Sequence, residues 1–375
     1  MILNKGEIIK QLNKPLLIKE NRVRRLYKGG ALIDRFRRHM VAKDDFLPED
    51  WIGSTTLAIN RDPIPEEGIG KLIIKDPKIS SDMEISFKKI LEIPEYAETL
   101  FGDGIERGKT PGILVKLLDS ITRLPLQTHP NKKFTSKYFH DNHGKCESWI
   151  VLEGRKINNE DPYVLYGFKE HVTKELFIKA YNEQKIKLME SFMNKIYVKP
   201  GDIFYIEPNI IHAIGPGVFL LEIQEPTDYV FQFDKKGEYW ELNDYEVHMG
   251  LGEEVMLNTI EYELKGSKLV NKNFSHIDIY KNYNDIIPLF KKEQNEYFGC
   301  DLITSEKSIQ RVHKEIRIGV VIEGSLNLNL NGSILQVQKG DTYMLPAPSG
   351  TAFHICNYNN IKGKDYFSIL EAFPI

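Results

Sequence analysis

The chain has 375 residues and is poor in cysteine, in long apolar runs and in net charge. Its three cysteines, Cys146, Cys300 and Cys356, are odd in number and far apart, which argues against a disulfide framework and against a thiolate-rich zinc knuckle. No stretch approaches the roughly eighteen uninterrupted apolar residues of a membrane span, and charges are scattered through the N-terminal segment. We therefore expect a cytoplasmic protein with no membrane partner.

Positive and negative charges nearly cancel. The 50 Lys and Arg residues against 53 Asp and Glu residues leave a formal net charge of -3. Nucleic acid is attracted by a basic field, which this composition does not supply. We expect no nucleic-acid partner, and the sequence leaves the oligomeric state open.

What the chain does contain is a succession of short runs rich in β-branched and aromatic residues, separated by Gly, Pro, Asn and Asp clusters. Residues 195–208, 217–224 and 319–337 are examples. This pattern predicts an all-β sandwich or barrel. Two helical patterns interrupt it, one at about 173–195 with a Thr173 cap and one around 83–100 that Pro94 divides. We expect these helices to form a small layer packed on the sheets.

An internal repeat indicates two copies of one β-fold. KPGDIFYIEP at 199–208 returns as QKGDTYMLPA at 338–347, each with a Gly-Asp turn, an apolar strand and a proline. A strand, a tight turn and a strand with an inward histidine are typical of a cupin-like jelly roll. We predict two such domains: a catalytic, metal-binding one at 1–265, which includes the helical insertion, and a degenerate one at 266–375.

The second copy is expected to lack a metal. Ten residues past the aspartate of the turn stands His212 in the first copy but Thr351 in the second, although His354 lies close by.

Four candidate metal ligands occur in strand-like runs. Gln127 and His129 are two residues apart in LPLQTHPN, so strand alternation points both to one side. Glu147 and His212 follow, each in a run of its own. Two imidazoles, a carboxylate and an amide oxygen suit Zn²⁺ and tolerate Mn²⁺, Co²⁺ or Fe²⁺. The spacing only modestly favours Glu147 over the competing carboxylates Glu153, Glu207 and Glu222.

The remaining histidines have no partner motif, and we expect them to be solvated: His39, His140, His143, His171, His248, His276 and His313.

Several motifs together resemble one known family. They are RLYKGGALIDRF at 25–36, GILVKLLDS at 112–120, LPLQTHPN at 124–131, GKCESWIVLEG at 144–154 and the run at 199–224. Most of the chain is similar to the type I mannose-6-phosphate isomerases, in particular the short bacterial form built from cupin domains. These enzymes interconvert mannose 6-phosphate and fructose 6-phosphate. The resemblance implies that Gln127, His129, Glu147 and His212 hold the metal.

The isomerase reaction explains why such a site is needed. A proton leaves C2 and returns to C1 through a cis-enediolate, which a cation beside O1 and O2 stabilises. Lys145 precedes Glu147 by two residues and faces the same cavity, whereas Cys146 points away and is rejected as catalytic. The resemblance adds Asp228 as a second proton-transfer candidate and places Lys116 in the pocket as a phosphate or hydroxyl contact.

One position departs from the family pattern. In TDYVFQFD, Gln232 stands where the family has an arginine. The substrate-binding residues therefore lack a guanidinium that could bind an anionic oxygen through two hydrogen bonds. Either a nearby cation such as Lys235, Lys236 or Arg317 substitutes, or this chain handles the sugar phosphate differently.

The leading hypothesis is a metal-dependent mannose-6-phosphate isomerase that acts on a small sugar phosphate. The alternative is a non-catalytic cupin that binds a metal and a sugar as a sensor or storage protein. An oxidative metal cupin that uses O₂ is a weaker third possibility.

Overall fold

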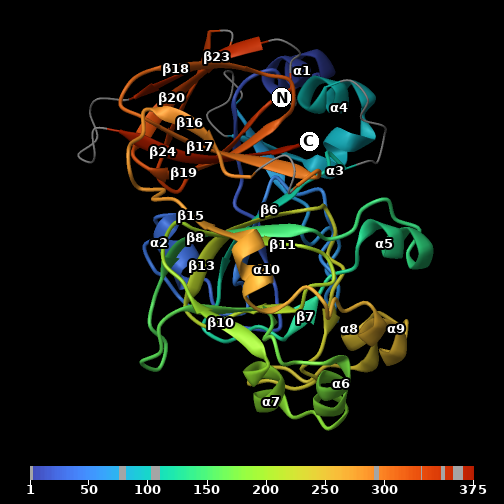
Figure 1. The fold of residues 1–375 in the computed structure, drawn as a ribbon. Coiled ribbons are helices and arrows are strands. Elements are labelled where there is room, and N and C mark those ends of the chain that lie inside the picture. Colours follow the sequence, from blue (N-terminus) through green and yellow to red (C-terminus); the bar gives the residue numbers. More distant parts are fainter. Residues whose placement is uncertain are drawn as a thin grey trace.

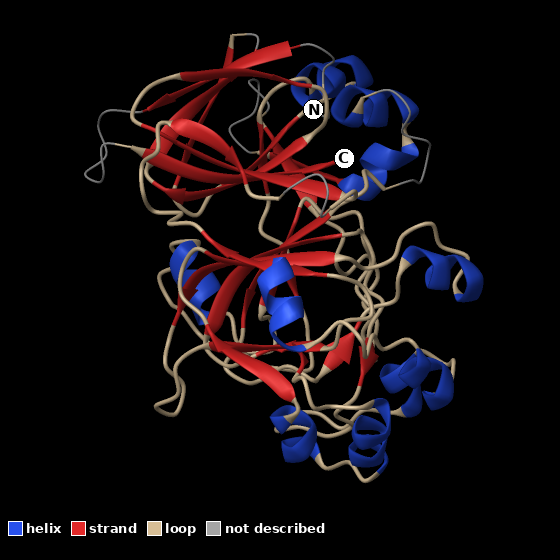
Figure 2. Ribbon diagram, viewed as in Figure 1, coloured by secondary structure: helices blue, strands red, loops and turns tan. Residues whose placement is uncertain are grey.

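The structure is a computed structural model that describes residues 3–75, 82–102, 110–290, 295–330, 332–347, 351–357 and 366–375, with the backbone alone for 351–357. Its strands form two stacked halves (Figure 1). Helices are short and lie around the sheets (Figure 2). The all-β class with a small helical layer is therefore confirmed.

The first half consists of two facing antiparallel sheets, here called the first barrel. A seven-stranded sheet has the order β15-β11-β8-β13-β6-β3-β2 and contains β2 (Arg22–Val23), β3 (Glu49–Ile52), β6 (Leu114–Asp119), β8 (Glu147–Gly154), β11 (Asp202–Ile206), β13 (Val218–Gln224) and β15 (Phe274–His276). A five-stranded sheet has the order β10-β9-β12-β7-β14 and contains β7 (Gln127–Thr128), β9 (Tyr163–Phe168), β10 (Met193–Tyr197), β12 (His212–Ile214) and β14 (Phe231–Gln232).

The second half is built in the same way and is called the second barrel. Its eight-stranded sheet has the order β16-β17-β24-β19-β22-β1-β4-β5 and contains β1 (Leu16–Ile18), β4 (Lys71–Ile74), β5 (Met83–Ser86), β16 (Asp285–Pro288), β17 (Phe298–Ser305), β19 (Arg317–Glu323), β22 (Thr342–Leu345) and β24 (Phe367–Pro374). The opposing sheet has the order β18-β23-β20-β21 and contains β18 (Ile309–His313), β20 (Ser325–Leu330), β21 (Ser333–Gln338) and β23 (Thr351–Asn357).

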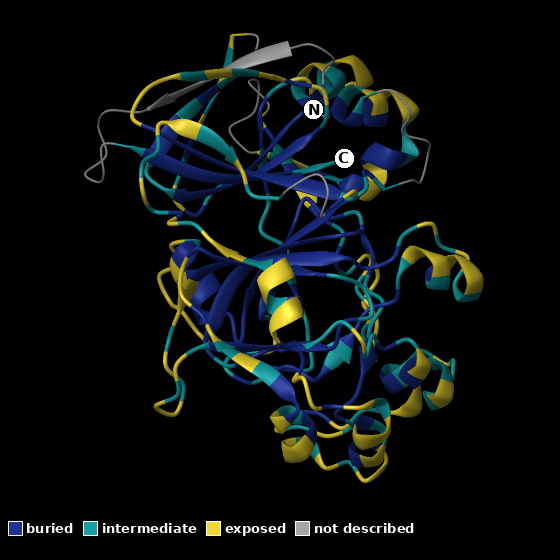
Figure 3. Ribbon diagram, viewed as in Figure 1, coloured by how far each residue is buried: buried dark blue, intermediate teal, exposed yellow. Residues whose placement is uncertain are grey.

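Helices cover the outside of both halves, with exposed outer faces over buried strands (Figure 3). Beside the second barrel lie α1 (Lys5–Leu12), α3 (Phe87–Glu92) and α4 (Pro94–Phe101). The first half carries α2 (Ala31–Phe36), α5 (Lys132–Tyr138), α6 (Lys174–Asn182), α7 (Ile186–Ser191), α8 (Asp244–His248), α9 (Glu253–Asn258) and α10 (Gly266–Asn273). Within the described ranges, no helix combines the length and the apolar character needed to span a membrane.

Alternation along β8 determines which side chains face the site. Trp149 and Val151 pack inside the first barrel, whereas Ile150 and Leu152 join the large apolar core between the seven-stranded and eight-stranded sheets. Glu147 shares the parity of Trp149. The strand therefore directs this carboxylate into the first barrel while its other face holds the two halves together.

The two predicted helical segments differ in detail from the structure. The expected helix at 173–195 is α6 and α7, separated by a turn in which Gln184 has φ 46°, followed by strand β10. Pairing of β10 with β9 outweighs the helical spacing of the apolar residues there. Thr173 caps α6 as predicted, since its hydroxyl accepts the Leu176 N–H at 3.3 Å. In the other segment, 83–86 is strand β5, and Pro94 begins α4.

The sheets are not divided at residue 265. Strands β1, β4 and β5 from the N-terminal part complete the eight-stranded sheet, where β1 pairs with β22. Conversely, β15 at Phe274–His276 pairs with β11 of the first barrel. The boundary between 265 and 266 stays a prediction, and the chain crosses between the halves more than once.

The internal repeat is visible in the backbone of its two turns. Gly201 and Gly340 have φ angles of 89° and 88°. Asp202 accepts the Lys199 N–H through Oδ2, and Asp341 accepts the Gln338 N–H in the same way, both at 2.9 Å. The two Gly-Asp segments therefore form the same turn.

This equivalence identifies which residues of the second barrel stand at the positions of the predicted metal ligands. Four residues after each aspartate, Ile206 pairs with Glu147 and Leu345 pairs with Arg317. Arg317 thus stands at the place of Glu147. By the same register, Glu371 and Asp301 take the places of Glu222 and Lys116.

A guanidinium therefore supplies the positive charge inside the second barrel. Arg317 lies 3.1 Å from Asp301, and Arg311 lies 3.2 Å from the same carboxylate. Glu371 accepts a hydrogen bond from the Tyr343 hydroxyl at 2.7 Å. His313, expected to be solvated, is 3% exposed and lies at the end of β18, so that expectation is wrong. It faces the Glu315 carbonyl through Nδ1 at 2.8 Å.

Candidate metal centre

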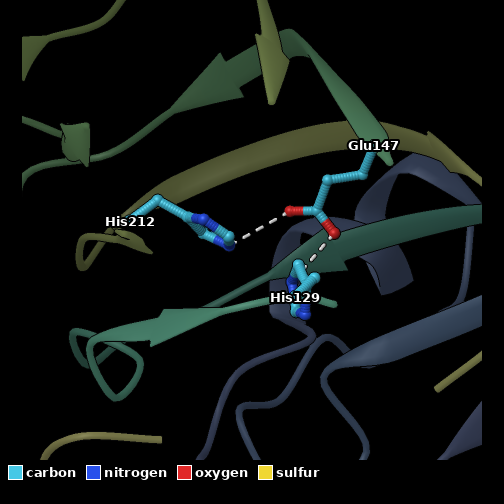
Figure 4. A group of neighbouring side chains, drawn as sticks. All are labelled: His129, Glu147 and His212. Atoms are coloured by element: carbon cyan, nitrogen blue, oxygen red, sulfur yellow. Dashed lines mark ion pairs between the residues drawn. The ribbon is translucent and has the colours of Figure 1, made fainter. Parts of the chain in front are cut away.

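Three of the four predicted ligands meet inside the first barrel, each from a different segment (Figure 4). Glu147 begins β8, His212 begins β12, and His129 follows β7. The ligand atoms of these three buried residues all lie within 4.8 Å of one another. Glu147 Oε2 is 3.2 Å from His129 Nε2, and Glu147 Oε1 is 3.3 Å from His212 Nε2.

Backbone carbonyls orient both imidazoles. His129 Nδ1 lies 2.9 Å from the Tyr229 carbonyl, and His212 Nδ1 lies 2.9 Å from the Ile210 carbonyl. A carbonyl only accepts, so each Nδ1 carries the hydrogen and each Nε2 offers a lone pair toward Glu147. Burial, assisted by the nearby Lys145 charge, lowers the pKa of His129 to about 3, which keeps this ring neutral at ordinary pH.

The carboxylate of Glu147 fits a bound cation. Both of its oxygens are buried, and neither accepts a hydrogen bond of good geometry from the part of the chain that the structure describes. Burial alone would raise the pKa of Glu147, but the charge of Lys145 outweighs this effect and holds the pKa well below its usual range. An ionised carboxylate between two imidazole lone pairs is a donor set for a divalent cation.

Gln127, the fourth predicted ligand, lies beside this group. It pairs with His212 across β7 and β12, and its amide nitrogen is 3.4 Å from His212 Nε2.

Lys145 lies where strand alternation predicts. Its Nζ is 2.9 Å from His129 Nε2 and 3.1 Å from Glu147 Oε2, so the ammonium contacts the atoms that would hold a cation. Cys146 points to the opposite side, where its Sγ lies 3.0 Å from the Tyr205 hydroxyl. Burial raises the pKa of the Cys146 thiol well above its usual range, consistent with an unreactive core residue.

The competing carboxylates are accounted for elsewhere. Glu222 pairs with Lys116 at 2.9 Å, Glu207 pairs with Lys272 at 2.6 Å, and Glu153 is exposed on β8. Glu147 is the acidic member of the histidine cluster.

A cavity of about 580 Å³ opens next to the cluster, a size typical of small-molecule sites. Gln127, Lys145, Lys116 and Glu222 are buried or partly buried residues of its wall. The wall also includes the segments 24–27, 59–62 and 239–243, with residues 245 and 246. Two of the remaining sequence-predicted residues, Asp228 and Gln232, line it as well.

Lys116 does not snorkel to the surface. It is 3% exposed and lies 5.0 Å from the centre of the Trp51 ring. Burial would lower the pKa of Lys116, but the negative charges of Glu222 and Glu49 outweigh it and raise the pKa. The ammonium is therefore a charged group in the cavity wall.

Arg25 is the principal residue that the sequence analysis missed. It donates two hydrogen bonds to Asp228, at 3.1 Å and 2.9 Å, and its Nε lies 3.0 Å from Glu49. Asp228 also accepts the Ile59 N–H at 2.8 Å, so three donors hold this carboxylate. The RLYKGG motif contained Arg25, but local spacing gives no sign that its partner lies 203 positions away.

The three cations considered as substitutes for the family arginine lie away from the cavity. Lys235 pairs with Glu253, Lys236 pairs with Glu241, and Arg317 lies in the second barrel. None of them is among the described residues that line the cavity, which favours the other alternative, a different handling of the sugar phosphate. Gln232 itself lines the cavity, and its amide N–H donates to the Glu246 carbonyl at 3.0 Å.

Comparisons with known proteins find relatives in sequence and in fold. No family model matches the chain. It is 29% identical over 168 residues to mannose-6-phosphate isomerase ManA of Bacillus subtilis, a match that covers 44% of this chain and 50% of that protein. The chain thus matches about half the length of this relative. It is 25% identical over 329 residues to "Putative mannose-6-phosphate isomerase YvyI" of the same organism, covering 86% of this chain and 90% of that one.

Solved structures show the same architecture. The mannose 6-phosphate isomerase of Bacillus subtilis superposes with a TM-score of 0.65 at 20% identity, over 96% of this chain and 99% of that chain. A mannose 6-phosphate isomerase bound with zinc and yttrium gives a TM-score of 0.66 at 12% identity, over the same shares. The chain has the fold of the phosphomannose isomerases. In sequence, too, the chain is similar to proteins named mannose-6-phosphate isomerase.

Proposed function

We propose that this protein is a metal-dependent aldose–ketose isomerase that interconverts mannose 6-phosphate and fructose 6-phosphate. The observation that carries the proposal is the convergence of His129, Glu147 and His212 beside the cavity, with two Nε2 lone pairs around a buried carboxylate. The similarity to proteins named mannose-6-phosphate isomerase supports the choice of substrate.

The metal would be held by Gln127, His129, Glu147 and His212, and this nitrogen and oxygen donor set favours Zn²⁺ while tolerating Mn²⁺, Co²⁺ or Fe²⁺. When bound, such an ion supplies Lewis-acid stabilisation of negative charge on neighbouring oxygen atoms.

The protein's own residues have separate tasks in the proton transfer between C2 and C1 through the cis-enediolate. Lys145, with its Nζ against two ligand side chains, is the first candidate to move the proton. Asp228 is the second candidate. It accepts three hydrogen bonds, two of them from Arg25, so it also fixes the orientation of the Arg25 side chain. Lys116 contributes positive charge to the wall, and Gln232 contributes an amide to the substrate-binding surface.

The test is fructose 6-phosphate formation from mannose 6-phosphate, before and after treatment with EDTA and again after Zn²⁺ is restored. We expect turnover to disappear with the metal and to return with it. Lys145→Ala should lower kcat by about 100-fold or more while metal content by elemental analysis stays unchanged. Lys133→Ala, which removes an exposed lysine of α5, is the matched control.

If the metal-loaded protein converts no hexose phosphate, the enzyme proposal is wrong. A non-catalytic cupin would instead retain sugar binding, and Lys145→Ala would change only its affinity.

A further inference from the structure

Most of the positively charged side chains in the cavity wall already form ion pairs with buried or nearly buried carboxylates. Lys116 and Glu222 have side chains 3% and 5% exposed, and Lys145 and Glu147 are 6% and 1% exposed. Arg25 and Asp228 are likewise nearly buried. Taking one partner from a buried ion pair leaves an uncompensated charge, which is strongly unfavourable. An incoming dianion therefore finds little free positive charge in the buried part of the wall.

Arg61 is different because it lies at the exposed rim. Its side chain is 54% exposed, and it belongs to the segment 55–68 that connects β3 and β4 without regular structure. Its Nε donates to Glu246 at 3.0 Å, and its Nη2 donates both to Glu246 and, at 2.7 Å, to the Glu241 carbonyl. The Glu246 side chain is 18% exposed and keeps the Asn243 N–H as a donor when Arg61 leaves, so an anion can replace it at a lower cost than in the fully buried pairs.

Arg24, the other partly exposed arginine of the rim, is less available. Its Nε and Nη2 form a fork on Glu67 at 2.9 Å and 3.0 Å, and Nη2 also donates to the Asp62 carbonyl at 2.6 Å. The carboxylate of Glu67 is 9% exposed, so displacement would uncover a mostly buried charge.

Trp240 offers a second donor in the wall of the same cavity. It is 9% exposed. Its indole N–H is buried and has no hydrogen-bond partner among the residues that the structure describes. A buried donor without an acceptor is unfavourable, and an oxygen-rich ligand removes that cost. Trp240 directly precedes Glu241, whose carbonyl binds Arg61.

We propose that Arg61 and Trp240 form a subsite for the phosphate group of the substrate at the cavity rim, and that Glu246 is the carboxylate that the phosphate displaces. The identity of the ligand as a sugar phosphate rests on the function proposed above. A guanidinium binds a phosphate dianion through two parallel hydrogen bonds, which Glu246 cannot match in charge. When Arg61 turns from the Glu241 carbonyl to the phosphate, the neighbouring indole N–H gains an acceptor.

The test measures KM and kcat for mannose 6-phosphate and, by calorimetry, the Kd of mannose 6-phosphate and of mannose on the metal-loaded full chain. Arg61→Gln should raise KM about tenfold or more with little change in kcat, and Arg61→Lys should lie between it and the unchanged protein. Trp240→Phe should also raise KM. Mannose binding should not respond to these substitutions.

Glu246→Gln provides a prediction of opposite sign. Glutamine keeps the acceptor for the Asn243 N–H that begins α8, but it removes the competing charge from Arg61. We expect KM to fall by about threefold. Arg38→Gln, which breaks an exposed ion pair with Asp341, is the control and should leave KM unchanged.

Each outcome separates the subsite from the proposed function. Arg61-dependent binding of mannose 6-phosphate without turnover supports the subsite and rejects the isomerase. An active isomerase whose KM ignores both Arg61→Gln and Glu246→Gln rejects the subsite alone. If both substitutions raise KM equally, Arg61 and Glu246 merely hold the rim together, and the subsite is also rejected.

Discussion

At the scale of single residues, the metal centre depends on groups that are not ligands. The carbonyls of Tyr229 and Ile210 each hold the Nδ1 of one histidine, and that contact decides which ring nitrogen faces the site. The sequence predicted the two histidines from their strand-like surroundings. The sequence could not predict the contacts to these carbonyls. Every residue has a backbone carbonyl, so the path of the folded chain decides which carbonyl lies beside each ring.

Glu49 has a similar supporting position in the cavity wall. It accepts hydrogen bonds from the Tyr27 hydroxyl at 2.5 Å and the Trp51 indole at 2.6 Å, and it lies beside Arg25. Burial alone would raise the pKa of Glu49, but the charges of Arg25 and Lys116 lower it from 4.5 to about 2. The folded state therefore favours the ionised carboxylate.

This shift predicts a pH dependence of stability. Because the pKa of Glu49 is lower in the folded state, its contribution is present above about pH 4.5 and is lost as the pH falls toward about 2. Glu49→Gln should reduce the free energy of unfolding at pH 7 by about 3 kcal/mol and should flatten its decline between these pH values. Urea denaturation at several pH values measures both effects. Glu254→Gln, at an exposed position of α9, is the control, and equal slopes in all three proteins would contradict the prediction.

At the scale of elements, pairing across a sheet decided what local spacing left open. The apolar residues near the end of the 173–195 segment have helical spacing, yet Met193–Tyr197 forms β10 because β9 offers it a partner. The Gly-Asp turns, in contrast, follow from their own residues. A positive φ at the glycine and an aspartate that binds the preceding backbone need no distant contact.

The same pairing shows what stands in the second barrel at the position of a candidate metal ligand. Strand β19 begins with Arg317 where β8 begins with Glu147, and the guanidinium compensates Asp301 directly. The second barrel therefore has the fixed positive charge of Arg317 at the position where the first barrel has Glu147, a candidate ligand for a metal ion.

Arg317→Met tests this exchange. Methionine retains an apolar stem against Phe373, over whose ring the guanidinium lies at 3.6 Å, but it removes the charge from Asp301. We expect the free energy of unfolding to fall by about 3 kcal/mol, with no change in bound metal per chain. Urea denaturation and elemental analysis measure the two quantities, and Lys314→Met at an exposed position is the control. Loss of metal from Arg317→Met would show that the second barrel takes part in metal binding.

At the scale of the whole molecule, the two halves share chain segments and a core. N-terminal strand β1 lies beside C-terminal strand β22, and the apolar core between the halves includes Ile150 and Leu221 on one side and Ile318 and Leu370 on the other. Both chain ends lie in the second half (Figure 1).

A fragment of residues 1–265 is therefore not expected to fold alone. It would leave β1, β4 and β5 without β22, and it would expose one face of the seven-stranded sheet to water. We expect such a fragment to be insoluble or to lack a cooperative thermal transition, and co-expression with 266–375 should restore both properties. Cooperative unfolding of 1–265 alone, with metal bound as in the full chain, would instead support independent domains.

The sequence by itself determined the class of fold and the repeated turn, and it predicted the residues of the candidate metal centre, because alternation, turn chemistry and donor type are local properties. Only the tertiary structure decided which charges meet. Arg25 binds Asp228 and Arg61 binds Glu246 across separations of 203 and 185 positions, and Arg317 replaces a ligand through strand register. Such contacts depend on where strands from distant parts of the chain come together, which the spacing of residues along the chain does not predict.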